Sequence, residues 1–329
     1  MTLDEFMTQW NDGNSRLLVH TSGSTGTPKP LWVEKSRMVA SARITCSFLG
    51  LRHGDTALLC MPLDFIAGKM MVVRSIVGKL RLLSVQPSSH PLATLTEAPV
   101  FAAMVPLQVW NSLQVPEERD LLRQIHHLII GGGAIDQSLE EELRHFPHAV
   151  WSTYGMTETL SHIALRRLSG KEASEWYTPF PTVSVKLNAE GCLVIDAPEV
   201  CRDALTTHDV AELAPNGRQF RIVGRIDNVI CSGGIKIQIE EAEKLLRPVI
   251  PIPFMITRVP DRELGEAVVL LHEPSSIAHE KLLDMCRKTL PKYWCPRHYI
   301  EIDHLPMTST GKPARAEAER MARKEIGER

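Results

Sequence analysis

The segment Thr21–Pro30 has the residue types of a phosphate-binding loop. Five hydroxyl side chains, two glycines and Lys29 lie between the apolar run 17–19 and the segment that begins at Leu31. Glycines let successive backbone N–H groups point at one anion, while the hydroxyls add donors and the lysine adds a cation. A polar linker has a similar composition, but the position directly after a strand-like run favours a site for the phosphates of a nucleotide. The segment lacks the Gly-Lys-Ser/Thr ending of a P-loop.

Apolar periodicity predicts that this segment belongs to an α/β domain. Ala40, Ile44 and Phe48 recur at four-residue spacing before Gly50, which predicts a helix over residues 36–49. A second apolar face predicts a helix over 69–80, and short apolar runs predict strands at 56–61, 100–105, 127–130 and 149–153. Strands that alternate with helices are typical of a sheet with helices on its faces.

The pattern changes twice in the second half of the chain. Alternating apolar residues from Val183 onward predict a small antiparallel sheet appended to the first part. Beyond residue 225 the sequence predicts a small α+β domain, with helices near 240–246 and 279–289 and strands at 254–258, 267–272 and 298–301. We therefore divide the chain into domains 1–226 and 227–329. The tail 314–329 has helical propensity, but its sequence supports no core-facing stripe.

Composition is that of an ordinary globular protein. The 329 residues carry a formal net charge of −2 and are 43% hydrophobic, which fits roughly two domains. Balanced charge gives no reason to expect nucleic acid or a membrane surface as a partner. No leader peptide or long apolar run is evident, and the seven cysteines form no C-x-x-C pair, so we expect a cytoplasmic protein with reduced thiols and no zinc site. The oligomeric state stays open, with a homodimer as one option.

Five segments in a fixed order resemble the motifs of the acyl-adenylate-forming (AMP-binding) superfamily. They are Thr21–Pro30, Ser152–Thr159, Thr207–Val210, Gly224–Gly234 and Pro306–Lys312. Each motif is weak alone, but five in order along most of the chain identify it as a member of that superfamily. The resemblance implies an acyl-CoA-synthetase-like large domain and a small mobile C-terminal domain. It also implies a small-molecule carboxylic acid as substrate, with ATP, Mg2+ and coenzyme A.

The resemblance implies a role for each motif. The phosphate loop would supply Thr21, Ser22, Gly23, Ser24, Thr25, Gly26 and Lys29. The adenosine would be bound by Gly131, Gly132, Gly133, Tyr154, Gly155, Asp209 and Arg225. Glu158 would hold Mg2+ with Thr157 beside it, Asp227 would be the hinge, and the coenzyme A channel would pass Ser232, Gly233 and Gly234. Lys312 would be the catalytic lysine, which stabilises charge between the attacking carboxylate and the phosphate.

The short chain and its motif wording resemble compact o-succinylbenzoate–CoA ligases of menaquinone (vitamin K2) biosynthesis. The phosphate loop begins at residue 21, whereas most of the superfamily has a long segment ahead of it, so we expect an N-terminally abbreviated form. An aromatic dicarboxylic acid needs an apolar slot and a cation for its second carboxylate. Arg74 matches an arginine position in that family and is our candidate for this cation. The weaker candidates for the acyl site are Lys69, Phe65 and His162.

Plainer interpretations stay open beside these roles. Arg74 and Lys69 have the alternative of ordinary solvated side chains on a helix, and His208 stands where the family usually has glycine. The alternatives for function are another aryl- or acyl-CoA ligase, an adenylating enzyme that loads a carrier-protein thiol, and a nucleotide-binding protein without catalysis.

Overall fold

A mixed sheet forms the centre of the large unit, which we define as elements α1 to β13. The computed structural model describes residues 1–20, 30–308 and 312–327. In this described part the sheet has seven strands in the order β4-β3-β5-β6-β7-β8-β9, parallel from β4 to β7 and antiparallel beyond. The strands are β3 (Thr56–Leu59), β4 (Arg81–Ser84), β5 (Phe101–Met104), β6 (His127–Ile130), β7 (Ala149–Gly155), β8 (His162–Arg167) and β9 (Thr178–Pro179). All four residues of β5 are buried, as in parallel strands covered on both faces.

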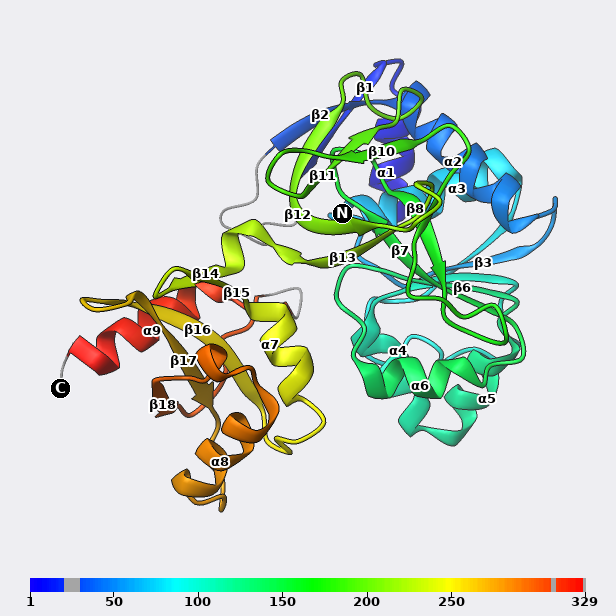
Figure 1. Cartoon of the computed structure of the whole chain (residues 1–329). Coiled ribbons are helices and arrows are strands. Elements are labelled where there is room, and N and C mark those ends of the chain that lie inside the picture. The colour runs from blue at the N-terminus through cyan, green and yellow to red at the C-terminus, as the bar shows by residue number, and fades with distance from the viewer. Residues whose placement is uncertain (21–29, 309–311, 328–329) are drawn as a thin grey trace.

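Helices cover this sheet on both sides. They are α1 (Leu3–Trp10), α2 (Lys35–Leu49), α3 (Ile66–Gly78), α4 (Pro106–Gln114), α5 (Pro116–Gln124) and α6 (Gln137–Arg144). Figure 1 shows α2 and α3 side by side above the sheet, with α4, α5 and α6 gathered below it. Helix α2 ends at Gly50, whose φ of 65° is the left-handed conformation of a common helix stop. The predicted helix over 36–49 is confirmed, whereas the sequence analysis did not predict α4, α5 and α6.

Two antiparallel sheets complete the large unit. Strands β1 (Arg16–His20) and β2 (Pro30–Glu34) pair with each other, so that His20 faces Pro30. The second sheet has the order β10-β11-β12-β13, with β10 (Ser184–Leu187), β11 (Cys192–Asp196), β12 (Leu205–Leu213) and β13 (Phe220–Arg225). It confirms the small antiparallel sheet predicted from the alternating residues. One continuous hydrophobic core runs through the large unit from Phe6 to Phe220.

The small unit, elements β14 to α9, follows a single turn of 3-10 helix, η1 (Ile226–Asn228). Its sheet has the order β15-β14-β17-β16, and β18 lies parallel to β17. The elements are β14 (Val229–Ser232), β15 (Ile235–Gln238), α7 (Ile239–Leu246), β16 (Phe254–Asp261), β17 (Gly265–His272), α8 (His279–Thr289), η2 (Lys292–Trp294), β18 (His298–Glu301) and α9 (Arg315–Gly327). Alternate residues of β17 belong to two separate cores, one with α7 and α8 and one with α9. The helices therefore cover opposite faces of this sheet.

Helix α9 corrects one expectation. The sequence of the charge-rich tail supported no core-facing stripe, yet Ala318 and Ala322 are fully buried. They lie four residues apart on one helix face and pack in the same core as Val269 of β17. Two small side chains among many charged ones give a weak periodic signal, although their small size lets the helix approach the sheet closely.

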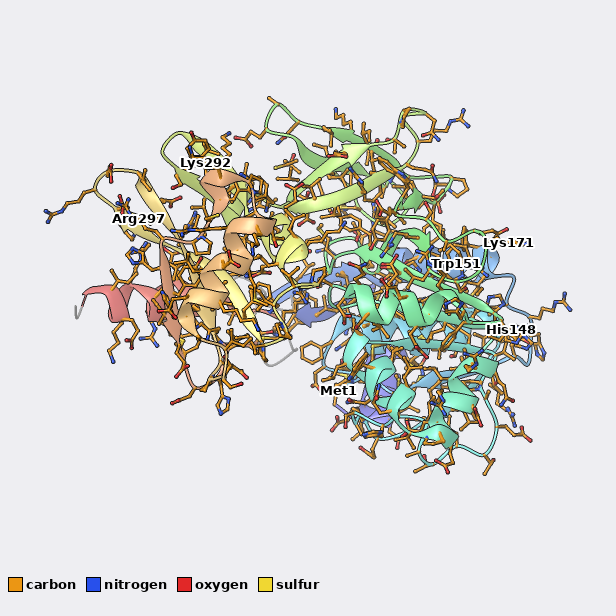
Figure 2. All side chains as sticks on the ribbon, turned by 60° about the horizontal axis from the view of Figure 1, so that its bottom comes forward. Met1, His148, Trp151, Lys171, Lys292 and Arg297 are labelled. Carbon is orange, nitrogen blue, oxygen red and sulfur yellow. The ribbon has the colours of Figure 1, made fainter. Side chains whose placement is uncertain are left out.

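The two units lie side by side in both views of the molecule. In Figure 1 they are joined through β13, η1 and β14, and in Figure 2 Trp151 and His148 mark the large unit while Lys292 and Arg297 mark the small one. The exact domain boundary between residues 226 and 227 stays a prediction. Among the helices that the structure describes, none is long and apolar enough to span a membrane.

A buried ion pair ties α9 to the rest of the small unit. Arg315 donates to both oxygens of Glu243 on α7, at 2.5 and 2.7 Å, and Glu243 also accepts from the backbone N–H of Ile256 at 2.8 Å. We expect Glu243→Ala to lower the free energy of unfolding of the small unit by about 3 kcal/mol, because it leaves a largely buried cation and an N–H group without a partner. Denaturant unfolding would measure this loss. The control is Glu241→Ala at an exposed position of the same helix; equal losses in both variants would contradict the prediction.

Candidate active site

The turn between β7 and β8 carries Thr157 and Glu158 at the carboxyl end of the parallel strands. A Cβ atom added at Gly155 would overlap the carbonyl of Ser161, so only glycine lets the two sides of the turn meet here. The Thr159 hydroxyl lies 3.0 Å from the N–H of Met156 and 2.8 Å from the Ser161 carbonyl, which closes the turn from inside. Ligands of α/β sheets bind at this end of the strands.

Glu158 and Thr157 differ in their exposure. Thr157 is buried, whereas Glu158 is exposed and makes no hydrogen bond or ion pair with any residue that the structure describes. Glu158 lies in a turn rather than at the start of a helix, so the helix dipole does not explain its position. Its carboxylate is available to a ligand.

A series of polar contacts runs from Tyr154 to Asp227, the residue predicted to be the hinge. The Tyr154 hydroxyl donates to Asp209 at 2.7 Å, and Arg225 donates to Asp209 at 3.0 Å and to Asp227 at 2.9 Å. Asp209 on β12 faces Arg225 on β13 in the strand register, which explains their contact. Burial, followed by the charge of Asp209, raises the pKa of Tyr154, so the phenol keeps its proton. These hydrogen bonds fix the Asp209 carboxylate and leave some of its lone pairs for further donors.

Lys312, in the small unit, lies close enough to these contacts for its ammonium group to interact electrostatically with Arg225 and Asp209. Its side chain is half-buried; burial and then the Arg225 guanidinium lower the pKa of its ammonium group, while Asp209 raises it. The backbone around it closes on itself, because the N–H of Lys312 donates to the Thr308 hydroxyl at 3.0 Å and the N–H of Thr308 donates to the Lys312 carbonyl at 2.7 Å. A cation from near the end of the chain therefore lies within electrostatic range of Asp209 and Arg225.

Asp227, the residue predicted to be the hinge, is held from two sides. Besides Arg225, His208 of β12 lies 2.9 and 3.0 Å from the two Asp227 oxygens through its Nδ1 atom. Burial opposes ionisation of Asp227, but the hydrogen bonds from His208 and Arg225 outweigh it and lower its pKa. His208, which stands where the family usually has glycine, thus contacts the predicted hinge residue, a contact that the sequence did not reveal.

The predicted glycine positions have local structural reasons. Gly131 follows β6, and a Cβ atom there would overlap the Thr153 hydroxyl of β7; Gly132 has a φ of 81°. Gly233 and Gly234, with φ values of 56° and 81°, form the two-residue loop between β14 and β15 next to Ser232. Positive φ at both loop residues is typical of a type I′ hairpin. Their roles towards adenine and coenzyme A stay predictions.

The candidate acyl residues lie on and beside α3, and three of them are buried. Arg74 and Lys69 are each 2% exposed, which rules out the solvated alternative for both. Lys69 donates to the Leu63 carbonyl at 2.6 Å, and burial lowers its pKa. His162 is also buried, whereas Phe65 is partly exposed at the position before the helix.

Arg74 has an unusual environment for a buried cation. It donates to the Ser161 hydroxyl at 2.5 Å, and its Nη1 atom lies 3.8 Å from the Met71 sulfur. Its Nε atom lacks a hydrogen-bond partner, and none of the carboxylates that the structure describes forms an ion pair with it. Burial lowers the pKa of the guanidinium to about 10, so it remains a cation at neutral pH. A buried charge without a counter-ion is costly and would be stabilised by an anionic ligand.

The phosphate-loop prediction lies outside the described residues. Thr21, Ser22, Gly23, Ser24, Thr25, Gly26 and Lys29 are all in the segment 21–29. The structure describes the strands on either side of it, and these strands pair with each other.

An α/β sheet with an appended small unit, and a lysine of that unit within electrostatic range of Asp209 and Arg225, are the features expected of the acyl-adenylate-forming ligases. The chain belongs to the AMP-binding enzyme family, whose model matches residues 6–199, and the model of the AMP-binding enzyme C-terminal domain matches residues 255–312. This confirms the superfamily and the fold class predicted from the five motifs.

Relatives and solved structures agree with this membership. A 2-succinylbenzoate–CoA ligase of Bacillus cytotoxicus is 26% identical over 333 residues, which cover 91% of this chain and 69% of that protein. An acyl-CoA synthetase (AMP-forming)/AMP-acid ligase II-like protein from Dyadobacter fermentans is 33% identical, with a TM-score of 0.65 and coverage of 97% of this chain and 92% of the other. The o-succinylbenzoate coenzyme A synthetase from Bacillus subtilis, in complex with ATP and magnesium ion, is 22% identical and has a TM-score of 0.75 over 91% of this chain and 69% of the other. At that identity the likeness establishes the fold.

Proposed function

We propose that this chain activates o-succinylbenzoate with ATP and transfers the acyl group to coenzyme A. The observation that carries the proposal is that Lys312 of the small unit lies within electrostatic range of Asp209 and Arg225, which are joined with Tyr154 by hydrogen bonds. A nucleotide site with a half-buried lysine from a second unit nearby suits a reaction between two anions, because the cation offsets their repulsion.

In the first step the substrate carboxylate attacks the α-phosphorus of ATP. The new bond joins a carboxylate oxygen to phosphorus, and the bond to pyrophosphate breaks, so that acyl-adenylate and pyrophosphate are the products. Asp209 would accept hydrogen bonds from the ribose hydroxyls, Tyr154 would offer a flat face to adenine beside Gly131–Gly133, and Lys312 would hold the attacking carboxylate close to the phosphate. The protein needs no nucleophile of its own for this step.

The exposed Glu158 fits a magnesium ligand. Magnesium binds oxygen atoms and commonly takes one or two protein carboxylates, with substrate phosphates and water completing the shell. Glu158 meets this requirement, since its carboxylate is exposed and unpaired among the described residues. Mg2+ bound with ATP would neutralise charge on the phosphates.

In the second step the thiolate of coenzyme A attacks the acyl carbonyl carbon and displaces AMP. We propose that Asp227 is the hinge about which the small unit reorients between the steps. Support comes from its place in the short link η1 between the two units. The loop of Ser232, Gly233 and Gly234 would then pass the thiol arm of coenzyme A, as the resemblance implies.

The buried Arg74 supports an acid with two carboxylates. One carboxylate would react, and the other would be the counter-ion that Arg74 lacks among the described side chains. The relatives named for 2-succinylbenzoate support the same acid, which has an aromatic ring and two carboxylates.

A panel of carboxylic acids screened for pyrophosphate release tests the proposal. We expect o-succinylbenzoate to give the fastest ATP-dependent release and a further, coenzyme A-dependent release of AMP. Benzoate and succinate serve as matched acids that each lack one part of the molecule. A higher rate with a different acid would identify that acid as the substrate in place of o-succinylbenzoate. Release of pyrophosphate without transfer to coenzyme A would favour an enzyme that loads a carrier-protein thiol.

A further inference from the structure

Arg74 on α3 forms a polar cluster with three side chains from other parts of the large unit. They are Thr45 on α2, and Ser161 and His162 at the end of the β7–β8 turn. Thr45 is fully buried, and His162 is 7% exposed. The contacts join residues up to 117 positions apart in the sequence. Because Ser161 lies three residues after Glu158 in the same turn, this cluster adjoins the proposed adenylation site.

The hydrogen atoms in this cluster can be assigned one by one. The Thr45 hydroxyl donates to the Ser41 carbonyl at 3.1 Å, so towards His162 it can only accept. His162 Nε2, 3.0 Å from that hydroxyl, therefore carries the ring proton. Burial, and then the charge of Arg74, hold the pKa of His162 well below its usual value, so the ring is neutral and Nδ1 is an acceptor.

The assignment continues to Arg74. Ser161 Oγ lies 3.2 Å from Nδ1 of His162, so the serine hydroxyl donates there. Its lone pairs then face Arg74, whose Nη2 donates to it at 2.5 Å. All donors in the series point the same way, from the guanidinium through Ser161, His162 and Thr45 to a backbone carbonyl. We call this series the arginine relay.

We propose that Ser161, His162 and Thr45 are positioning residues that hold Arg74 for an anionic group of the acid substrate. The relay gives the guanidinium one neutral acceptor and leaves its charge uncompensated, because a carboxylate in the place of Ser161 would compete with the ligand. It also revises the expected role of His162: both ring nitrogens are engaged, so His162 acts through Ser161 and does not contact the substrate. This inference rests on the proposed function for its choice of ligand.

Steady-state kinetics with two acids tests the relay. Ser161→Ala should raise the Michaelis constant for o-succinylbenzoate about tenfold and leave that for an aromatic monocarboxylic acid within about twofold, because a charge-assisted hydrogen bond that orients the cation is lost. Thr45→Val should also raise the Michaelis constant for o-succinylbenzoate, whereas Thr45→Ser, which keeps the hydroxyl, should leave this constant at the wild-type value. Ser75→Ala is the matched control, since Ser75 is a buried serine of α3 that donates to the Met71 carbonyl instead. Equal changes for both acids would overturn the positioning role.

Nitrogen-15 NMR of labelled histidine tests the relay independently of the substrate. The wild-type protein should show His162 as neutral with the proton on Nε2 at neutral pH, and Thr45→Val should change that signal. A charged His162, or a proton on Nδ1, would overturn the relay even if the acid were correctly identified. If His162 is neutral with its proton on Nε2 but o-succinylbenzoate is not turned over, the proposed substrate is rejected and the relay is not. In that case Ser161→Ala should weaken the binding of other aromatic dicarboxylates, and unchanged binding would overturn the relay.

Discussion

Replacing Lys312 with alanine should lower the rate of adenylate formation by about a hundredfold or more, the usual scale for losing one preorganised charge at a reacting centre. The carboxylate and the phosphate both carry negative charge, and Lys312 is a cation of the small unit that interacts electrostatically with Asp209 and Arg225. Thioester formation from supplied acyl-adenylate should stay within about twofold, because the phosphate bond is then already made. The two half-reactions are measured separately, as pyrophosphate release and as AMP release.

Two comparisons sharpen this result. Lys288→Ala removes an exposed lysine of α8 that pairs with Asp284 and should change neither half-reaction. Equal losses in both half-reactions of Lys312→Ala would contradict the assigned role. In the wild-type enzyme, adenylation should also decline at alkaline pH with a midpoint below the ordinary lysine value of 10.5, because burial and Arg225 lower the pKa of Lys312 and the charged form is the active one.

Replacing Arg74 with alanine should raise the Michaelis constant for o-succinylbenzoate by about a hundredfold, which corresponds to losing a charge-assisted hydrogen bond of about 3 kcal/mol. The constant for an aromatic monocarboxylic acid should change far less, since that acid has no second carboxylate to pair with the guanidinium. The ratio between the two acids is the measurement, because a general loss of folding would affect both equally.

Variants of similar size separate charge from packing at this position. Arg74→Lys keeps a cation but loses the planar fork, so it should fall between the wild type and Arg74→Ala. Arg74→Met keeps much of the buried volume without charge and should resemble Arg74→Ala. Arg81→Ala removes an exposed arginine of β4 as a control. A uniform change for both acids in Arg74→Ala would show that Arg74 does not contact the distal carboxylate.

Local sequence patterns were sufficient for much of the fold. The helix over 36–49 and the strand over 127–130 follow from short-range periodicity and a glycine stop, and both agree closely with α2 and β6. Helix α9 was harder, because its core contact rests on Ala318 and Ala322, whose side chains contribute little hydrophobic signal. The short helices α4, α5 and α6 were not predicted.

The sequence by itself determined the family, because the order of five motifs is a property of the chain that needs no coordinates. It also named Lys312, Asp209 and Arg74 as residues that could carry chemistry. Only the tertiary structure decided that Lys312 lies within electrostatic range of Asp209 and that Arg74 is buried without a carboxylate among the described residues. It also decided that Ser161 and Thr45 belong to the hydrogen-bonded series that begins at Arg74. The physical reason is that charge compensation and hydrogen-bond direction depend on which distant segments pack together. Neither residue type nor spacing along the chain records that packing.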